Sequence, residues 1–211
     1  MLIKSSPLRG GWVGFGGLSI MQTNIIISGV GGQGILTIAS IIDLAAMQQG
    51  LQVKQAEVHG MSQRGGAVES HLRISDTEIY SDLIPKGKAN IILSIEPMES
   101  LRYLPFLAPD GIIVTATEPF VNIANYPDEA AIRQEIAKTG KHLFVDAEAL
   151  AREAGSLKAF NTVMLGAAAN YIGISKEALE KAIESYFTAK GEEIVALNIK
   201  AFRLGAECVN K

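Results

Sequence analysis

Apolar residues recur along the chain in two patterns, short continuous runs and longer stripes with helical spacing. The short runs predict buried strands at residues 24–28, 51–58, 91–95, 111–117 and 143–145. The stripes predict helices at residues 35–47, 128–139 and 147–154, with another helix starting at Pro97. Strands that alternate with helices imply right-handed βαβ units. We therefore predict an α/β, Rossmann-like open sheet, mainly parallel, with helices on both faces.

One alternating stretch interrupts this rhythm. Between residues 67 and 74, apolar side chains occupy one face, and Glu69, His71 and Arg73 occupy the other. The turn sequence SDTE follows, and residues 79–83 then read as a returning strand. The pattern predicts an inserted antiparallel hairpin, placed at the sheet edge or as an arm. We expect His71 on this polar face, and His142 before the last strand, to be exposed to solvent.

The two ends of the chain differ in character. Residues 1–20 contain five glycines and no clean period, so we expect a disordered leader ahead of a single domain at 21–211. An upstream start codon ahead of Met21 is the alternative explanation. The C-terminal part is predicted to be helical, with one stripe at 178–187 and a second at 194–208. Cys208 continues the second stripe, which predicts a packed thiol.

Composition limits the classes of function. The chain has 211 residues, 48% of them hydrophobic, with a formal net charge of −3 and one cysteine. The charge gives no electrostatic reason to expect nucleic acid. One cysteine cannot form an internal disulfide or hold an iron–sulfur cluster, and it suits a reducing, cytoplasmic setting. No apolar run reaches the length of a membrane span, so we expect no membrane association.

A glycine-rich loop joins the first predicted strand to the first helix. Residues 25–40 read IIISGVGGQGILTIAS and contain the spacing G-x-G-x-x-G. In this context Gly29 is predicted to allow a tight turn, Gly31 a close approach of the backbone to a ligand or neighbour, and Gly34 close packing of the helix on the strand. The helix N-terminus suits a phosphate group. The candidate residues of this loop are Gly29, Gly31, Gly32, Gln33 and Gly34.

A dinucleotide site needs one more feature. An Asp or Glu should follow the glycines by about 20 residues to hold a ribose hydroxyl. Val53, Lys54 and Gln55 stand at that distance, and Glu57 comes late. Classical NAD binding is therefore disfavoured, while a glycine turn that serves only packing remains an open alternative.

A second motif, EVHGMSQRGG at residues 57–66, follows the second strand. The carboxyl ends of parallel strands are where open α/β folds bind ligands, so this motif is predicted to lie beside the glycine loop. Arg64 could clasp a phosphate, or could pair with Glu57 or a neighbouring chain. The candidate residues are Glu57, His59, Ser62, Gln63, Arg64, Gly65 and Gly66. We predict no catalytic residue and no metal ligand in this chain.

These two motifs, together with KANIILSIEPMESLRYLPFL at 88–107 and NTVMLGAAANYIG at 161–173, carry a family resemblance. Over residues 22–190 the chain resembles the gamma-type subunits of 2-oxoacid:ferredoxin oxidoreductases, and within them the beta subunits of the indolepyruvate type. Residues 1–20 lie outside the resemblance.

The resemblance implies a role in a complex. Such complexes decarboxylate a 2-oxoacid on thiamine diphosphate, pass electrons through iron–sulfur clusters to ferredoxin, and release an acyl-CoA. A large partner subunit would carry the thiamine diphosphate and the clusters. This chain would be inactive alone, would shape the interface with that subunit, and would help to hold coenzyme A. A self-contained NAD(P)-dependent oxidoreductase and a ligand-free docking module are the alternatives.

Overall fold

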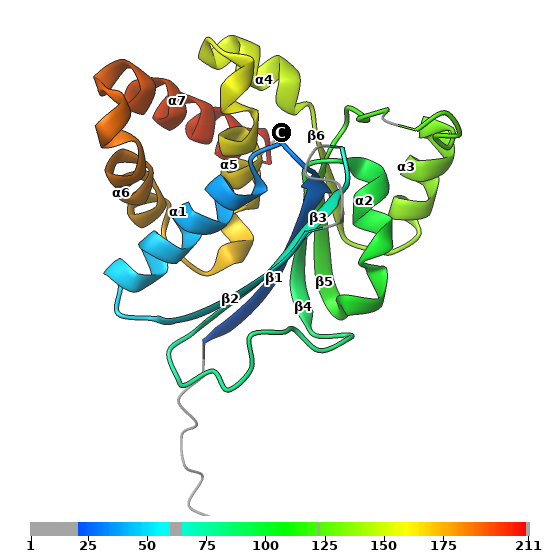
Figure 1. Ribbon diagram of the computed structural model, residues 1–211, viewed down its shortest axis with the longest axis horizontal. Helices are drawn as coiled ribbons and strands as arrows, with labels where there is room; N and C mark the ends of the chain where they lie inside the picture. The colour runs from blue at the N-terminus through cyan, green and yellow to red at the C-terminus, as the bar shows by residue number, and fades with distance from the viewer. Residues whose placement is uncertain (1–20, 60–64, 122, 210–211) are drawn as a thin grey trace, which may run out of the picture.

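The computed structural model describes residues 21–59, 65–121 and 123–209, which form one six-stranded sheet flanked by helices (Figure 1). The order across the sheet is β2-β3-β1-β4-β5-β6. The strands are β1 (Gln22–Val30), β2 (Gln52–His59), β3 (Ala67–Ser75), β4 (Ala89–Ser94), β5 (Leu107–Ala116) and β6 (His142–Val145). The α/β fold class with a mainly parallel sheet is confirmed.

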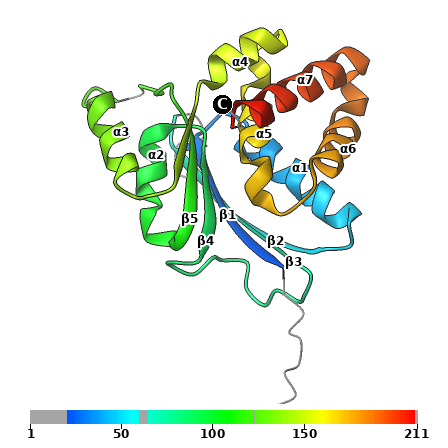
Figure 2. The ribbon, with the colours of Figure 1, turned by 180° about the vertical axis from the view of Figure 1, so that it is seen from behind.

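Helices cover the two faces unequally, as Figures 1 and 2 show. The larger layer contains α1 (Ile35–Gln48), α4 (Ala147–Ala154), α5 (Phe160–Ile172), α6 (Lys176–Phe187) and α7 (Glu192–Cys208). The smaller layer contains α2 (Pro97–Arg102) and α3 (Glu129–Ala137). Alternation along β1 serves both layers, because Ile25 and Ile27 enter the larger core and Ile26 the smaller one.

The antiparallel insertion lies inside the sheet. β3 pairs antiparallel with β1 on one side and with β2 on the other, so β2 is the edge strand. The hairpin is therefore β2–β3, and the predicted return strand at 79–83 is wrong, because these residues are irregular. A local alternating pattern shows which face a residue takes but not which strand lies beside it.

The prediction that His71 faces solvent is also wrong. His71 is 3% exposed, because the irregular segment 76–88 and the ring of Phe106 cover the polar face of β3. The Ile84 N–H donates to Nδ1 of His71 at 3.1 Å. Burial lowers the pKa of His71, against the opposing effect of Glu69. His142 is exposed, as predicted.

Helices α5 and α7 cross in unusually close contact. A Cβ added to Gly166 would lie 2.0 Å from the carbonyl oxygen of Phe202, and one added to Gly205 would lie 2.0 Å from that of Val163. The buried residues of α7 are Asn198, Ala201, Phe202, Gly205 and Ala206. Of the stripe that the sequence predicts, Ala201 is buried, Leu197, Leu204 and Cys208 pack against the larger core, and Ile194 is exposed. Cys208 is thus a packed thiol, as predicted.

Within the described part of the chain, no helix combines the length and apolar character needed to cross a membrane.

Candidate functional site

The glycine loop makes the turn from β1 into α1. Gly32 and Gly34 have positive φ angles of 102° and 79°, the left-handed region that favours glycine. Gly34 stands immediately before the first residue of α1, and no side chain caps that helix end. Gln33 closes the turn on itself, since its Oε1 accepts a hydrogen bond from the Val30 N–H at 2.8 Å. The loop is therefore a turn closed by a side-chain hydrogen bond, and the N-terminus of α1 that follows it has no side-chain cap.

The structural roles of Gly29 and Gly34 differ from those that the sequence predicts. Gly29 remains within β1, where an added Cβ would lie 2.8 Å from Gln33 Oε1 and 3.2 Å from Ile95 Cβ. Gly29 thus allows close packing, and the turn is made later. Gly34 does not adjoin a strand: an added Cβ there would lie 2.5 Å from Nδ2 of Asn161, on α5.

The two predicted loops meet through their backbones. The N–H of Gly31 donates to the carbonyl oxygen of Gly66 at 2.9 Å. Glu57, at the end of β2, is exposed and accepts a hydrogen bond from Gln55 Nε2 at 2.8 Å. Gly65 has a φ of 78°. Ser62, Gln63 and Arg64, and the side chain of His59, lie outside the described residues.

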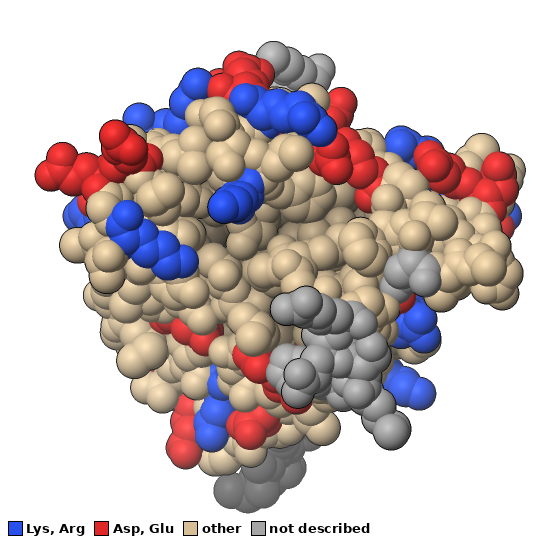
Figure 3. Space-filling model, turned by 45° about the horizontal axis from the view of Figure 1, so that its top comes forward, with Lys and Arg blue, Asp and Glu red and all other residues tan. Residues whose placement is uncertain are grey.

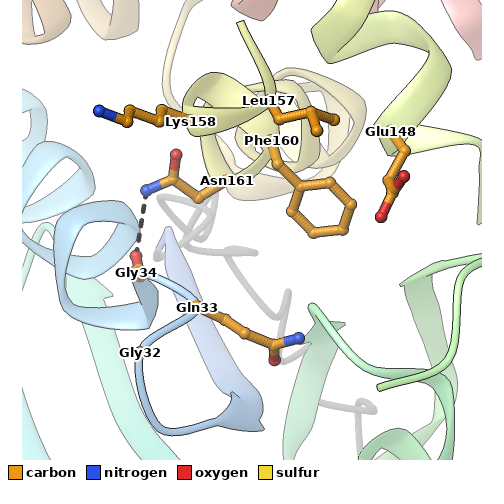
Figure 4. A pocket seen from close by; sticks show the side chains of 8 residues that line it. All are labelled: Gly32, Gln33, Gly34, Glu148, Leu157, Lys158, Phe160 and Asn161. Carbon is orange, nitrogen blue, oxygen red and sulfur yellow. Dashed lines mark hydrogen bonds between the residues drawn. The ribbon is translucent and has the colours of Figure 1, made fainter. Parts of the chain in front are cut away.

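A cavity of about 360 Å³ opens on one side of the glycine loop (Figure 4). Gln33 reaches into it from the loop, and Phe160 and Glu148 face it from α5 and α4. Asn161 connects α5 to the glycine loop at this cavity, because its Nδ2 donates to the carbonyl oxygen of Gly34 at 3.3 Å. We call it the glycine-loop cavity. It is lined by Gly32, Gln33, Gly34, Glu148, Leu157, Lys158, Phe160 and Asn161.

A second, more apolar hollow of about 320 Å³ lies on the other side of the same loop. Ile35 and Leu36 line it from α1, and Val68 lines it from β3. The glycine loop therefore separates two hollows at the carboxyl end of β1. In Figure 3 this end of the molecule is turned toward the viewer, and many of its charged side chains lie toward the rim. An open α/β sheet binds its ligands at this end.

Carboxyl groups follow the next three strands at the same end. Glu96 after β4 is fully buried and accepts hydrogen bonds from the Tyr126 hydroxyl and the Glu99 N–H. Burial raises the pKa of Glu96. Burial and the hydrogen-bonding contact with the neighbouring Asp146 likewise raise the pKa of Glu118. Glu96 therefore anchors the segment that carries Tyr126, and Asp146 caps α4 by accepting from the Ala149 N–H.

Asp43 is a separate, half-buried acid on α1. Its Oδ1 has no hydrogen-bond partner within the described residues. Burial, and to a lesser degree the negative charge of Glu57, raises the pKa of Asp43 to about 6. The described residues contain no group of three His, Cys, Asp or Glu side chains that could hold a metal ion.

The far wall of the glycine-loop cavity carries no local sequence pattern that marks it as a site. Glu148, Lys158, Phe160 and Asn161 were not predicted as site residues. Asn161 is 127 positions from Gly34, so no local spacing could join them. The one available signal was that Asn161 is the first residue of NTVMLGAAANYIG, a segment that carries the family resemblance.

The fold and the glycine loop define a Rossmann-like domain with its hollows at the carboxyl end of the sheet. The chain belongs to the pyruvate ferredoxin/flavodoxin oxidoreductase family, whose model matches residues 24–208. It is 39% identical over 200 residues to the indolepyruvate oxidoreductase subunit IorB of Pyrococcus horikoshii, covering 90% of this chain and 97% of that one.

Solved structures share this fold. Subunit PORC of the pyruvate oxidoreductase of Thermotoga maritima is 25% identical, with a TM-score of 0.68, covering 88% of this chain and 96% of that chain. The 2-oxoglutarate:ferredoxin oxidoreductase of Magnetococcus marinus, solved with 2-oxoglutarate, coenzyme A and succinyl-CoA bound, matches at 23% identity and a TM-score of 0.73. That match covers 90% of this chain but only 31% of the longer chain, and it bears on the fold alone.

Proposed function

We propose that this chain is the small subunit of an indolepyruvate:ferredoxin oxidoreductase, active only with a large partner subunit. Support comes from the family assignment and from the 39% identity to an indolepyruvate oxidoreductase subunit along almost its whole length. The sequence adds a chemical argument, since one cysteine cannot supply the thiolates of an iron–sulfur cluster. The clusters, the thiamine diphosphate and the contact with ferredoxin therefore belong to the partner in this proposal.

The contribution of this chain is to hold part of coenzyme A at the glycine loop. The observation that carries this proposal is the pair of hollows on the two sides of that loop. Gly32 has no atom within 4 Å of the place that a Cβ would take, which leaves its backbone accessible to a ligand. The uncapped start of α1 offers N–H groups and a partial positive charge to a phosphate. The family assignment lends no support to the NAD(P)-dependent alternative.

The test is reconstitution. The chain and its co-expressed large subunit are assayed for reduction of ferredoxin with indolepyruvate, pyruvate or 2-oxoglutarate, with and without coenzyme A. We expect activity only when both chains are present, with the highest kcat/KM for indolepyruvate. Ferredoxin reduction by the large subunit alone at an unchanged rate would contradict the proposed role, and a preference for another 2-oxoacid would correct the substrate.

Arg64 is the residue of the 57–66 motif to which we assign an ionic role. It holds either a phosphate of coenzyme A or an acid of the large subunit, and both roles need its planar, permanently charged group. Arg64→Ala should raise the KM for coenzyme A in an intact complex in the first case. In the second case it should weaken the complex. Arg64→Lys should reproduce most of either defect, and unchanged behaviour of both variants would remove Arg64 from the site.

A further inference from the structure

A third cavity, of about 260 Å³, adjoins the glycine-loop cavity and shares Lys158 and Asn161 with its lining. We call it the two-lysine cavity. It is lined by Thr37, Ser156, Lys158, Asn161, Phe187, Lys190, Ile194, Leu197 and Asn198. These residues come from α1, α5, α6 and α7 and from the turns at Leu157–Ala159 and Thr188–Lys190. The proposed function makes no use of it.

The charged side chains that line this cavity are all positive. Two lysines line it and no acid does, although the chain as a whole has a net charge of −3. The glycine-loop cavity differs, because there Glu148 faces the opening and pairs with Arg152 at 3.3 Å. Figure 4 shows the side chain of Lys158 extending away from Phe160 and Glu148.

The second ammonium group is held by aromatic rings. Nζ of Lys190 lies 5.1 Å from the centroid of the Phe187 ring and 5.9 Å from that of Tyr186, within the range of cation–π attraction. Neither Lys158 nor Lys190 forms an ion pair with any residue that the structure describes. Both ammonium groups can therefore donate to an incoming anion.

The rest of the lining is suited to an apolar body. Phe187, Ile194 and Leu197 supply apolar surface beside the two lysines. Asn198 is 4% exposed, and its amide is used internally, accepting from Thr162 Oγ1 at 2.7 Å and donating to the Ile194 carbonyl oxygen at 2.8 Å. Apolar walls with a few convergent polar groups are the usual lining of a small-molecule site.

We propose that the two-lysine cavity binds a small organic anion, with its phosphate or carboxylate between Lys158 and Lys190 and its apolar part on Phe187, Ile194 and Leu197. The volume lies below the range of about 300–1,000 Å³ that drug-sized ligands occupy, so the ligand is much smaller than a whole coenzyme A. Because Asn161 borders this cavity and also holds Gly34, a ligand here can influence the glycine loop.

Isothermal titration of the folded chain at low ionic strength tests the proposal, because salt screens exposed charges. The probes are phenyl phosphate and phenylacetate, which separate the two anion classes, with inorganic phosphate and neutral benzyl alcohol as controls. At least one aromatic anion should bind about tenfold more tightly than both controls. Absence of saturable binding, or equal affinity for inorganic phosphate, would overturn the proposal.

Variants locate the binding. Lys158→Ala and Lys190→Ala should each weaken it about tenfold or more, while Lys181→Ala, an exposed lysine of α6 outside the cavity, should leave it unchanged. Leu197→Ala should weaken the aromatic anion but not inorganic phosphate. Equal binding by the wild type and the double lysine variant would refute the site. Full competition by coenzyme A would show instead that the cavity is one end of the coenzyme A site. That result would overturn the proposal that the cavity binds a separate ligand.

Discussion

Gly32 and Gly34 share a left-handed backbone but differ in their surroundings. Gly32 faces open space, whereas a Cβ on Gly34 would meet the amide of Asn161. Gly32→Ala should therefore cost only the backbone strain, about 1–2 kcal/mol. Gly34→Ala should add overpacking and cost about 2–5 kcal/mol. Urea unfolding of both variants measures the difference, and equal losses would mean that Asn161 simply moves aside.

Asp43 gives a residue-scale prediction about pH. Its pKa is raised from 3.8 to about 6, so the folded protein holds this proton more tightly than the unfolded chain. The free energy of unfolding must then fall as pH rises from about 4 to about 6, and the loss remains at pH 7. Two pK units correspond to about 3 kcal/mol, which partial exposure reduces to about 1–2 kcal/mol.

Asp43→Asn should consequently stabilise the protein by about 1 kcal/mol at pH 7, and the gain should vanish below about pH 4. Denaturant unfolding at several pH values checks this. Asp110→Asn is the matched control, because that side chain is exposed. A gain that persists unchanged at pH 3.5 would show that removal of the charge is not its cause.

At the scale of elements, the crossing of α5 and α7 depends on two glycines. In an ordinary helix, Gly→Ala stabilises by up to about 1 kcal/mol. Here each added Cβ would overlap a backbone carbonyl of the other helix, so Gly166→Ala and Gly205→Ala should each destabilise by about 2 kcal/mol or more. The double variant should cost less than the sum, because the first methyl group already separates the helices. Additive losses would mean that each site relaxes independently.

The loop after β5 donates two hydrogen bonds to the buried Glu96, one from the Tyr126 hydroxyl and one from the Phe120 N–H. Tyr126→Phe removes the hydroxyl that donates to Glu96 and should cost about 1–3 kcal/mol. Hydrogen exchange should rise in residues 117–127 and stay constant in β1. Tyr80→Phe is the control, since Tyr80 is 88% exposed. Unchanged exchange in the loop would assign the anchoring to the Phe120 N–H contact with Glu96 instead.

At the scale of the whole molecule, prediction from sequence succeeded where the determining forces are local. The apolar run before the glycines and the stripe after them specify β1, the turn and α1. The neighbours of β1 are not specified locally, so the central place of β3 was missed. His71 was misplaced for a related reason, because the irregular segment that buries it shows no periodicity. Lys158, Lys190 and Asn161 line the cavities only because distant segments meet in the fold.

The position of β1 affects how the chain can fold while it is being synthesised. Among the described strands β1 is made first, yet its two partners end at Ser75 and Ser94, and α5 and α6 of the larger layer begin only at Phe160 and Lys176. The fully buried Ile25, Ile26 and Ile27 therefore emerge from the ribosome before β3 and β4, the strands with which β1 pairs. Synthesis at about 5–20 residues per second leaves this strand exposed for seconds. A nascent chain stalled before Ser94 should therefore be a chaperone substrate, and one stalled beyond the end of α7 should not.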